Sequence, residues 1–203
     1  MEEIFHKKIL NTHIYVWKMT SSYEDQIKNP LLKSAELISA EELKNEKRKK
    51  EFLSSRIALK KIFNKELELK YHKSGKPFIK EAKHLSISHS SNFLALAYGD
   101  ENIGIDIEKP QNRMIKLMPK ILSEIELMEF NKEPTVDLAC KLWGAKEAIL
   151  KYLGDKNLNY KADIKVNTKS LGIAECLKLD FKVEFEKIEN MILTYVLRSD
   201  KTK

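Results

Sequence analysis

Three short apolar runs joined by very short links constrain the fold of this chain more than any other feature. The runs are HLSISH ending at His89, FLALAY from Phe93 to Tyr98, and NIGIDIE ending at Glu108, and the links are SSN and GDEN. Links this short connect antiparallel neighbours, so the pattern predicts a three-stranded meander. Its first and third strands would run the same way, about 10 Å apart, with His89, Asp106 and Glu108 near one edge of the sheet.

Helical patterns on both sides of these strands predict a mixed α+β fold. A helix is expected from Ser39 to Phe63, because Ser39 and Glu42 have capping-box spacing and apolar residues recur on one face. The other face of this helix is densely basic. A turn built on Gly75 and Pro77 follows in HKSGKPFI.

The C-terminal part of the chain continues with helices and then strands. Ser123 and Glu126 suggest a helix cap, and DLACKLWGAKEAILKYLG reads as a helix that ends at Gly154. Between Asp163 and Arg198, LKLDFKVEFEKI and MILTYVLR alternate well enough to predict a final β-hairpin.

Length and composition limit the kind of protein. A chain of 203 residues with 42% hydrophobic content allows one sizeable core or two small lobes. The apolar runs fall far short of the roughly 20 residues that span a bilayer, and the start MEEIFHKK lacks the apolar stretch of a secretion signal. We therefore expect a cytoplasmic protein with no membrane partner. The net charge of +7 favours an anionic partner: nucleic acid, a phosphorylated small molecule or an acidic protein.

Cysteines and histidines do not form a metal-binding pattern. Cys140 and Cys176 are the only cysteines and the five histidines are scattered, so two free thiols in a reducing compartment are expected. Any metal would have to be held by oxygen ligands.

The strand NIGIDIE carries two carboxylates on one face. Because side chains alternate along a strand, the three isoleucines point one way, while Gly104, Asp106 and Glu108 point the other. With α-carbons about 7 Å apart, the two carboxylates can converge on one Mg²⁺, and the missing side chain of Gly104 leaves room beside them. A half-exposed strand with a solvated acidic face explains the same pattern equally well.

The helix KLWGAKEAILKYLG has a second face that its own core does not explain. Glu147 lies nearly opposite the apolar stripe, and Trp143, Lys146 and Lys151 share its side. An exposed helix with an ion pair between Glu147 and Lys151 accounts for the charges. It does not account for Trp143, which suggests that another lobe or a ligand covers this face.

Several residues could neutralise phosphate charge: Lys76 in the SGKP turn, His89 after SIS, Arg56 on the basic helix, and Lys146 with Lys151. Each also has a structural explanation, as a turn residue, a strand-end cap or a solvated face. The glycine-rich phosphate loops of common nucleotide-binding folds are absent.

Taken in order, SGKP, SISHS, GIDIE and WGAKEAILK resemble the 4'-phosphopantetheinyl transferase superfamily, in particular its longer surfactin-synthetase-activating type. The resemblance extends from about Ser39 to Lys151. It implies an enzyme that transfers the 4'-phosphopantetheine arm of coenzyme A to a serine of an acyl, peptidyl or aryl carrier protein, releasing adenosine 3',5'-bisphosphate. It also implies two pseudo-twofold-related α+β lobes, each an antiparallel sheet packed with helices. Two lobes in one chain make a monomer the simplest expectation. We expect lobes 1–100, with coenzyme A contacts, and 101–203, with the metal and catalytic carboxylates.

The same resemblance implies roles for individual residues. Asp106, Glu108 and Glu147 would bind Mg²⁺, and Glu147 would also deprotonate the carrier serine. Lys151 would stabilise the pyrophosphate or the leaving group. The implied coenzyme A contacts are Arg56, Lys76, Pro77, Ser88, His89, Lys146 and Lys151.

The basic helix and the carrier surface match less closely. Phe52 and Arg56 have the family's F-x-x-x-R register, but Glu51 stands where an arginine is frequent. Lysines nearby could contact the 3'-phosphate or attract an acidic carrier protein. The segment Arg113 to Leu122, rich in methionine and aliphatic residues, is a hypothetical carrier-docking surface, and capping of the second lobe's core is an equally good explanation.

Two other functions, non-catalytic binding and nucleic-acid binding, fit the sequence less well. A non-catalytic coenzyme A or carrier-binding protein of the same fold would not need Asp106, Glu108 and Glu147 together, so their presence favours the enzyme. A nucleic-acid-binding module predicts aromatic residues interleaved with the basic ones, and the main basic run contains only Phe52, so no nucleic-acid partner is expected.

Overall fold

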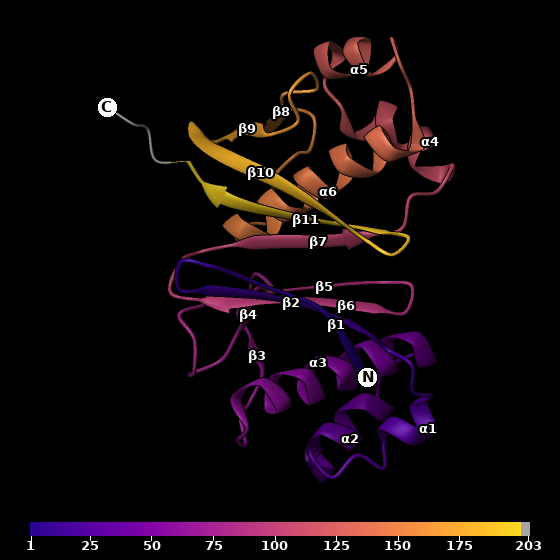
Figure 1. Cartoon of the computed structure of the whole chain (residues 1–203), viewed down its shortest axis with the longest axis vertical. Coiled ribbons are helices and arrows are strands. Elements are labelled where there is room, and N and C mark those ends of the chain that lie inside the picture. Colours follow the sequence, from indigo (N-terminus) through magenta and orange to yellow (C-terminus); the bar gives the residue numbers. More distant parts are fainter. Residues whose placement is uncertain (200–203) are drawn as a thin grey trace.

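Two antiparallel sheets packed face to face form the centre of the computed structural model, which describes residues 1–199, and helices cover the outer face of each sheet (Figure 1). The first sheet has the order β1 (Glu2–Ile9), β2 (Thr12–Lys18), β6 (Phe93–Gly99) and β5 (His84–Ser90). The second has the order β7 (Gly104–Glu108), β11 (Met191–Arg198), β10 (Leu179–Ile188), β9 (Ile173–Cys176) and β8 (Ile164–Val166). The predicted mixed α+β fold of antiparallel sheets and helices is confirmed.

The helices divide in the same way as the strands. On the first sheet lie α1 (Tyr23–Gln26), α2 (Ser34–Glu41) and α3 (Glu46–Phe63), and on the second lie α4 (Arg113–Ile121), α5 (Glu124–Phe130) and α6 (Val136–Leu153). A small ribbon of β3 (Lys70–Tyr71) and β4 (Pro77–Phe78) stands beside the first sheet. The chain passes from the first sheet to the second between Gly99 and Gly104.

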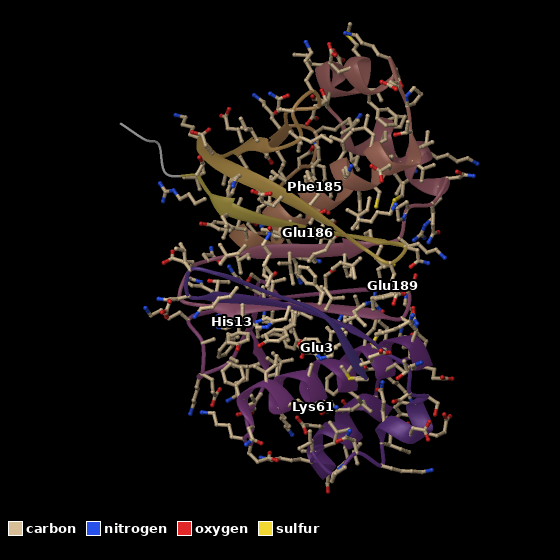
Figure 2. All side chains as sticks on the ribbon, viewed as in Figure 1. Glu3, His13, Lys61, Phe185, Glu186 and Glu189 are labelled. Carbon is tan, nitrogen blue, oxygen red and sulfur yellow. The ribbon has the colours of Figure 1, made fainter. Side chains whose placement is uncertain are left out.

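Apolar side chains from both sheets meet in the layer between them. Ile103, immediately before β7, and Ile105 and Ile107 on β7 are fully buried there against residues of β2, β6 and β11. Ion pairs also join the sheets, from Lys7 to Glu186 at 2.7 Å and from Lys18 to Glu189 at 2.9 Å (Figure 2). Burial of these three isoleucines therefore fixes which face β7 turns toward α6.

The predicted three-stranded meander is only partly right. Strands β5 and β6 form the expected hairpin, but β7 pairs with β11 and belongs to the second sheet. Beside β5, backbone pairing is replaced by serine hydroxyls: Ser86 Oγ accepts the N–H of Ile105 at 3.1 Å, and Ser88 Oγ accepts that of Ile107 at 3.3 Å. The two strands still run the same way, as expected, so their C-terminal ends reach the same edge.

The helix expected from Ser39 to Phe63 is in fact two helices. Ser39 lies inside α2, and the long helix α3 begins only at Glu46. Asn45 has extended backbone angles, and its side chain accepts the N–H of Arg48 at 2.9 Å. Asparagine is among the strongest N-caps, so a new helix starts after Asn45.

Other predicted elements are confirmed. Ser123 and Glu126 form a capping box at α5, and α6 ends at Gly154 with a φ of 69°. The final hairpin is β10 paired with β11. Within residues 1–199, no helix combines the length and apolar character needed to cross a membrane.

Candidate active site

Close packing of α6 on β7 and β11 builds the site. A Cβ atom at Gly104 would lie 1.9 Å from the carbonyl oxygen of Ala148, and one at Gly144 would lie 2.5 Å from Thr194 Oγ1. The expectation that Gly104 leaves room for a metal is therefore wrong, because the helix backbone fills that space. Gly104 instead allows the helix to lie directly against the strand that carries the carboxylates.

Asp106 is the central and most buried of the three predicted carboxylates, with a relative exposure of 3%. Its Oδ1 accepts hydrogen bonds from Ser88 Oγ at 2.8 Å and from Lys151 Nζ at 2.7 Å. Its Oδ2 is buried and has no hydrogen-bond partner among residues 1–199. An unpaired buried carboxylate oxygen is costly, and a bound cation would satisfy it.

Glu108 and Glu147 are half-buried and feel the charge of Asp106. Burial, and then the neighbouring Asp106, raises the pKa of both carboxyl groups above the usual value. Ser90 Oγ donates to Glu108 at 2.7 Å, and the hydroxyl of Tyr160 donates to Glu147. All three carboxylates thus accept a hydroxyl hydrogen bond, each from a different residue.

Trp143 is covered, as its position among charged residues suggested. Its ring stacks on that of Tyr160, with centroids 5.7 Å apart, and its side chain hydrogen-bonds Glu108. The cover comes from the chain itself, through Tyr160 in the segment that follows α6.

The carboxylates do not form a ready metal cage in the present arrangement. Among residues 1–199, no group of three or more His, Cys, Asp or Glu side chains lies close enough together to hold a metal ion. Mg²⁺ binding by Asp106, Glu108 and Glu147 therefore stays a prediction.

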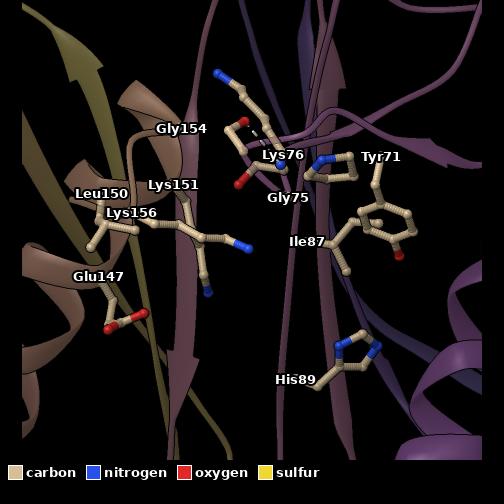
Figure 3. A pocket seen from close by; sticks show the side chains of 13 residues that line it. Tyr71, Gly75, Lys76, Ile87, His89, Glu147, Leu150, Lys151, Gly154 and Lys156 are labelled. Carbon is tan, nitrogen blue, oxygen red and sulfur yellow. Dashed lines mark hydrogen bonds between the residues drawn. The ribbon is translucent and has the colours of Figure 1, made fainter. Parts of the chain in front are cut away.

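A pocket of about 310 Å³ lies beside Glu147, between α6 and the first-sheet side of the molecule (Figure 3). Lys151 and Lys156 reach into it from one side, while Tyr71, Ile87 and His89 face them from the other. Its remaining lining residues are Ser74, Gly75, Lys76, Pro77, Ser86, Leu150 and Gly154. Two lysines in a half-enclosed space suit a ligand with several negative charges.

A second pocket of about 520 Å³ shares Tyr71 and His89 with the first. Its lining includes Lys44, which precedes α3, and Arg48 and Glu51 of α3. Glu51 forms an ion pair with Arg48 at 2.9 Å, so the glutamate holds one basic side chain at the rim. Together the two pockets provide space for an elongated ligand on both sides of His89.

His89 separates the two pockets as a neutral imidazole. Its Nε2 lies 3.0 Å from Ser55 Oγ. Burial, together with the positive charges of Lys151 and Arg48, lowers the pKa of His89 to about 3. The ring can therefore exchange hydrogen bonds with a phosphate but does not carry a positive charge at neutral pH before a ligand binds.

Other predicted phosphate contacts have different surroundings. Lys76 and Pro77 line the pocket, but Lys76 Nζ donates to Asn102 Oδ1 at 3.0 Å and to the Tyr152 carbonyl at 2.6 Å. Ser88 is bonded to Asp106 and does not line either pocket. Lys76 thus ties the turn to α6, and Ser88 supports a carboxylate.

Lys146 and Arg56 lie outside both pockets, contrary to their predicted coenzyme A contacts. Lys146 is fully buried and donates to Glu126, to the Tyr160 carbonyl and to the Ile164 carbonyl at 2.6 to 2.8 Å. Arg56 lies over the Phe52 ring, and its Nη1 donates to the Phe52 carbonyl at 2.9 Å. Helical spacing placed Lys146 on the Glu147 side but could not show that folded chain covers it there.

The hypothetical docking segment also proves to be mostly core. Met114, Met118 and Ile121 of α4 and the following Leu122 are buried in the core cluster that α4 and α6 form with the second sheet. This supports the alternative explanation, that the segment caps the core.

Sequence reasoning missed Lys156, Arg48, Tyr71 and Tyr160. Lys156 and Tyr160 stand in an irregular segment after Gly154, where no periodicity points to a face. A search for basic residues just after the helix-ending glycine would have found Lys156. No pattern marks Tyr160.

Comparisons with known proteins agree with this site. Residues 102–195 match the family described as the 4'-phosphopantetheinyl transferase superfamily. The 4'-phosphopantetheinyl transferase Sfp of Bacillus subtilis is 33% identical over 94 residues, which cover 44% of this chain and 42% of that protein. The 4'-phosphopantetheinyl transferase gsp of Aneurinibacillus migulanus is 30% identical over 101 residues, 48% of this chain and 43% of its own length.

A longer match extends toward the N-terminal side. The putative 4'-phosphopantetheinyl transferase slr0495 of Synechocystis is 28% identical over 141 residues, 61% of this chain and 57% of that protein. The chain thus matches about half the length of these curated relatives. Residues 102–195, which contain Asp106, Glu108 and Glu147, are therefore similar to the 4'-phosphopantetheinyl transferase superfamily, and to its Sfp type in particular.

Proposed function

We propose that this chain transfers the 4'-phosphopantetheine arm of coenzyme A to a serine hydroxyl of an acyl, peptidyl or aryl carrier protein, releasing adenosine 3',5'-bisphosphate. The observation that carries the proposal is the lysine-lined pocket that opens beside Glu147, a residue of the segment that matches the family. Coenzyme A carries a pyrophosphate and a 3'-phosphate. Lys151 and Lys156 would face its pyrophosphate, and the pocket with Lys44 and Arg48 offers further positive charge.

Glu147 would act as the base. Burial raises the pKa of Glu147, which makes it a better proton acceptor than an ordinary carboxylate. As the serine oxygen forms its bond to the phosphorus next to pantetheine, the serine proton would pass to Glu147, directly or through water. The bond from that phosphorus to the adenosine bisphosphate oxygen breaks, and Lys151 or Lys156 would stabilise the departing charge.

We also propose a divalent cation, Mg²⁺, held by Asp106, Glu108 and Glu147. Three carboxylates are the hard oxygen donors that Mg²⁺ prefers, and the unpaired Oδ2 of Asp106 supports a cation there. Bound Mg²⁺ would neutralise charge on the phosphates as the phosphoanhydride breaks.

The partners and setting are proposals from the sequence. The net charge of +7 supports an acidic carrier protein. We further propose that residues 1–100 contribute coenzyme A contacts and that residues 101–203 contribute the carboxylates. A monomeric state and a cytoplasmic location stay predictions.

Mass spectrometry of carrier proteins tests the function directly. We expect incubation with coenzyme A, Mg²⁺ and an apo carrier protein to add one phosphopantetheine group to the carrier. A panel of fatty-acid, polyketide and peptide carriers should be used, because the sequence does not identify the substrate. If no carrier gains the group, the proposal is refuted, and coenzyme A binding without transfer would point to the non-catalytic alternative.

A further inference from the structure

Tyr160 connects two of the three carboxylates through an aromatic pair. The Tyr160 ring stacks on Trp143, with an angle of 26° between ring planes. The Trp143 side chain hydrogen-bonds Glu108, and the Tyr160 hydroxyl donates to Glu147 Oε1. Trp143 and Tyr160 thus hold Glu108 and Glu147 by two hydrogen-bond donors on stacked rings.

The main chain of Tyr160 is held as firmly as its side chain. The buried ammonium of Lys146 donates to the Tyr160 carbonyl at 2.7 Å and also pairs with Glu126 at 2.8 Å. One residue earlier, the N–H of Asn159 donates to Asp163 Oδ2 at 2.7 Å. A segment with no regular secondary structure is thereby fixed against α6, which limits where the phenol oxygen can go.

Lys146 therefore has an indirect link to the site. It lies one residue before Glu147 on α6 but points to the segment that carries Tyr160. Helix α6 thus supplies Glu147, the ring on which Tyr160 stacks, and the ammonium that fixes the Tyr160 backbone. These three contacts converge on Tyr160, which no sequence motif marks.

We infer that Tyr160 is a positioning residue, which anchors Oε1 of Glu147 and thereby presents the other carboxylate oxygen to the cation and the serine proton. The inference rests on the proposed function of Glu147. A carboxylate anchored through one oxygen loses rotational freedom, so less ordering remains to be done when metal and substrate arrive. Tyr160 itself touches no reacting atom.

The Tyr160→Phe variant tests this role, because it removes only the hydroxyl and keeps a ring to stack on Trp143. Mn²⁺ binding, measured by electron paramagnetic resonance with saturating coenzyme A, gives a readout that does not depend on turnover. We expect affinity for Mn²⁺ to fall about 10- to 100-fold, as is typical when a group that orients a metal ligand is lost. We expect kcat to fall as well, with the KM for coenzyme A changed less than about twofold, because Tyr160 does not line the pocket.

Tyr98→Phe is the matched control, since Tyr98 lies in the aromatic stack of the first sheet with Tyr15 and Phe63. It should leave Mn²⁺ affinity and kcat unchanged. Wild-type Mn²⁺ affinity and wild-type kcat in Tyr160→Phe would overturn the inference while leaving the proposed function intact. If the wild-type protein itself neither binds Mn²⁺ with coenzyme A nor modifies any carrier, the proposed function fails and the inference falls with it.

Discussion

At the scale of single residues, burial and hydrogen-bond donors have opposite effects on the pKa of Glu108 and of Glu147. Burial raises the pKa of Glu108 and of Glu147, and the charge of Asp106 adds to this effect. Hydroxyl donors oppose it, because a hydrogen bond to a carboxylate favours its charged form. Glu108 and Glu147 thus have raised pKa values and oxygens that are oriented by hydroxyl donors, which suits both cation binding and proton abstraction.

Replacing Glu147 by glutamine should separate chemistry from binding. The amide has the same shape but cannot accept the serine proton, so we expect kcat to fall about 10²- to 10⁴-fold, the usual contribution of a general base. Coenzyme A binding should remain measurable by calorimetry. The exposed Glu175 provides the control, since Glu175→Gln should keep full activity. Undiminished transfer by Glu147→Gln would refute the role given to this residue.

His89 should make stability sensitive to mild acid. Its pKa is about 3 in the folded protein and about 6.5 when unfolded. Between these values the unfolded state binds more protons, so stability is full above pH 6.5 and falls as the pH decreases toward 3. Allowing for solvent in the two pockets, we expect a loss of about 1 to 2 kcal/mol between pH 7 and pH 5.

Urea unfolding of the wild type and of His89→Gln at pH 7 and pH 5 measures this contribution. The pH-dependent loss of stability should be smaller in His89→Gln by that amount. Equal pH dependence in the two proteins would show that His89 is not held as a neutral ring.

At the scale of elements, β7 shows what the sequence could and could not predict. Alternation correctly placed three isoleucines on one face and Asp106 with Glu108 on the other. The sheet to which β7 belongs could not be predicted, because its partner β11 lies near the other end of the described chain. Short links indicate which strands are close, and the serines of β5 keep β7 close without a shared ladder.

Helix α6, which carries Glu147, shows the same limit for side-chain partners. Its end at Gly154 was predicted correctly from a local signal, and the structure adds an N-cap at Thr135. The direction of the Lys146 side chain was not predicted. It contacts the carbonyls of Tyr160 and Ile164, which belong to a segment whose path is set by tertiary packing. Local rules therefore predict the element, whereas side-chain partners from irregular segments need the structure.

A side chain at position 104 should disrupt the packing of α6 against β7. In Gly104→Ala the new methyl would collide with the Ala148 carbonyl, so helix or strand must move. We expect a loss of about 3 kcal/mol, at the upper end of overpacking effects, and reduced activity because Asp106 is two residues away. Chemical denaturation with a transfer assay measures both.

Gly172 is the matched control for this substitution. A Cβ atom there would meet its nearest atoms at 3.7 and 3.9 Å, which is ordinary contact. Gly172→Ala should change stability by less than about 0.5 kcal/mol. Similar stability of the two variants would mean that the helix can separate from β7 at little cost.

At the scale of the whole molecule, the pocket is assembled from both parts of the chain. Lys151 and Lys156 belong to the side of the second sheet, while Tyr71 and His89 belong to the side of the first. A ligand bound between them would have to hold the two sides together. The increase in the thermal stability of the protein on binding coenzyme A would therefore depend on contacts with both sides of the pocket at once.

Thermal unfolding with coenzyme A and Mg²⁺ tests this arrangement. At a ligand concentration 100 times the Kd, mass action adds about 2.7 kcal/mol, which for a domain of this size raises Tm by roughly 5 to 10 °C. Pantetheine lacks the phosphates and should give little shift. Lys156→Ala should reduce the shift produced by coenzyme A, whereas Lys161→Ala, at an exposed position outside the pocket, should not. An equal shift with pantetheine, or equal shifts in the two lysine variants, would mean that the ligand does not place its phosphates between Lys156 and the first-sheet side.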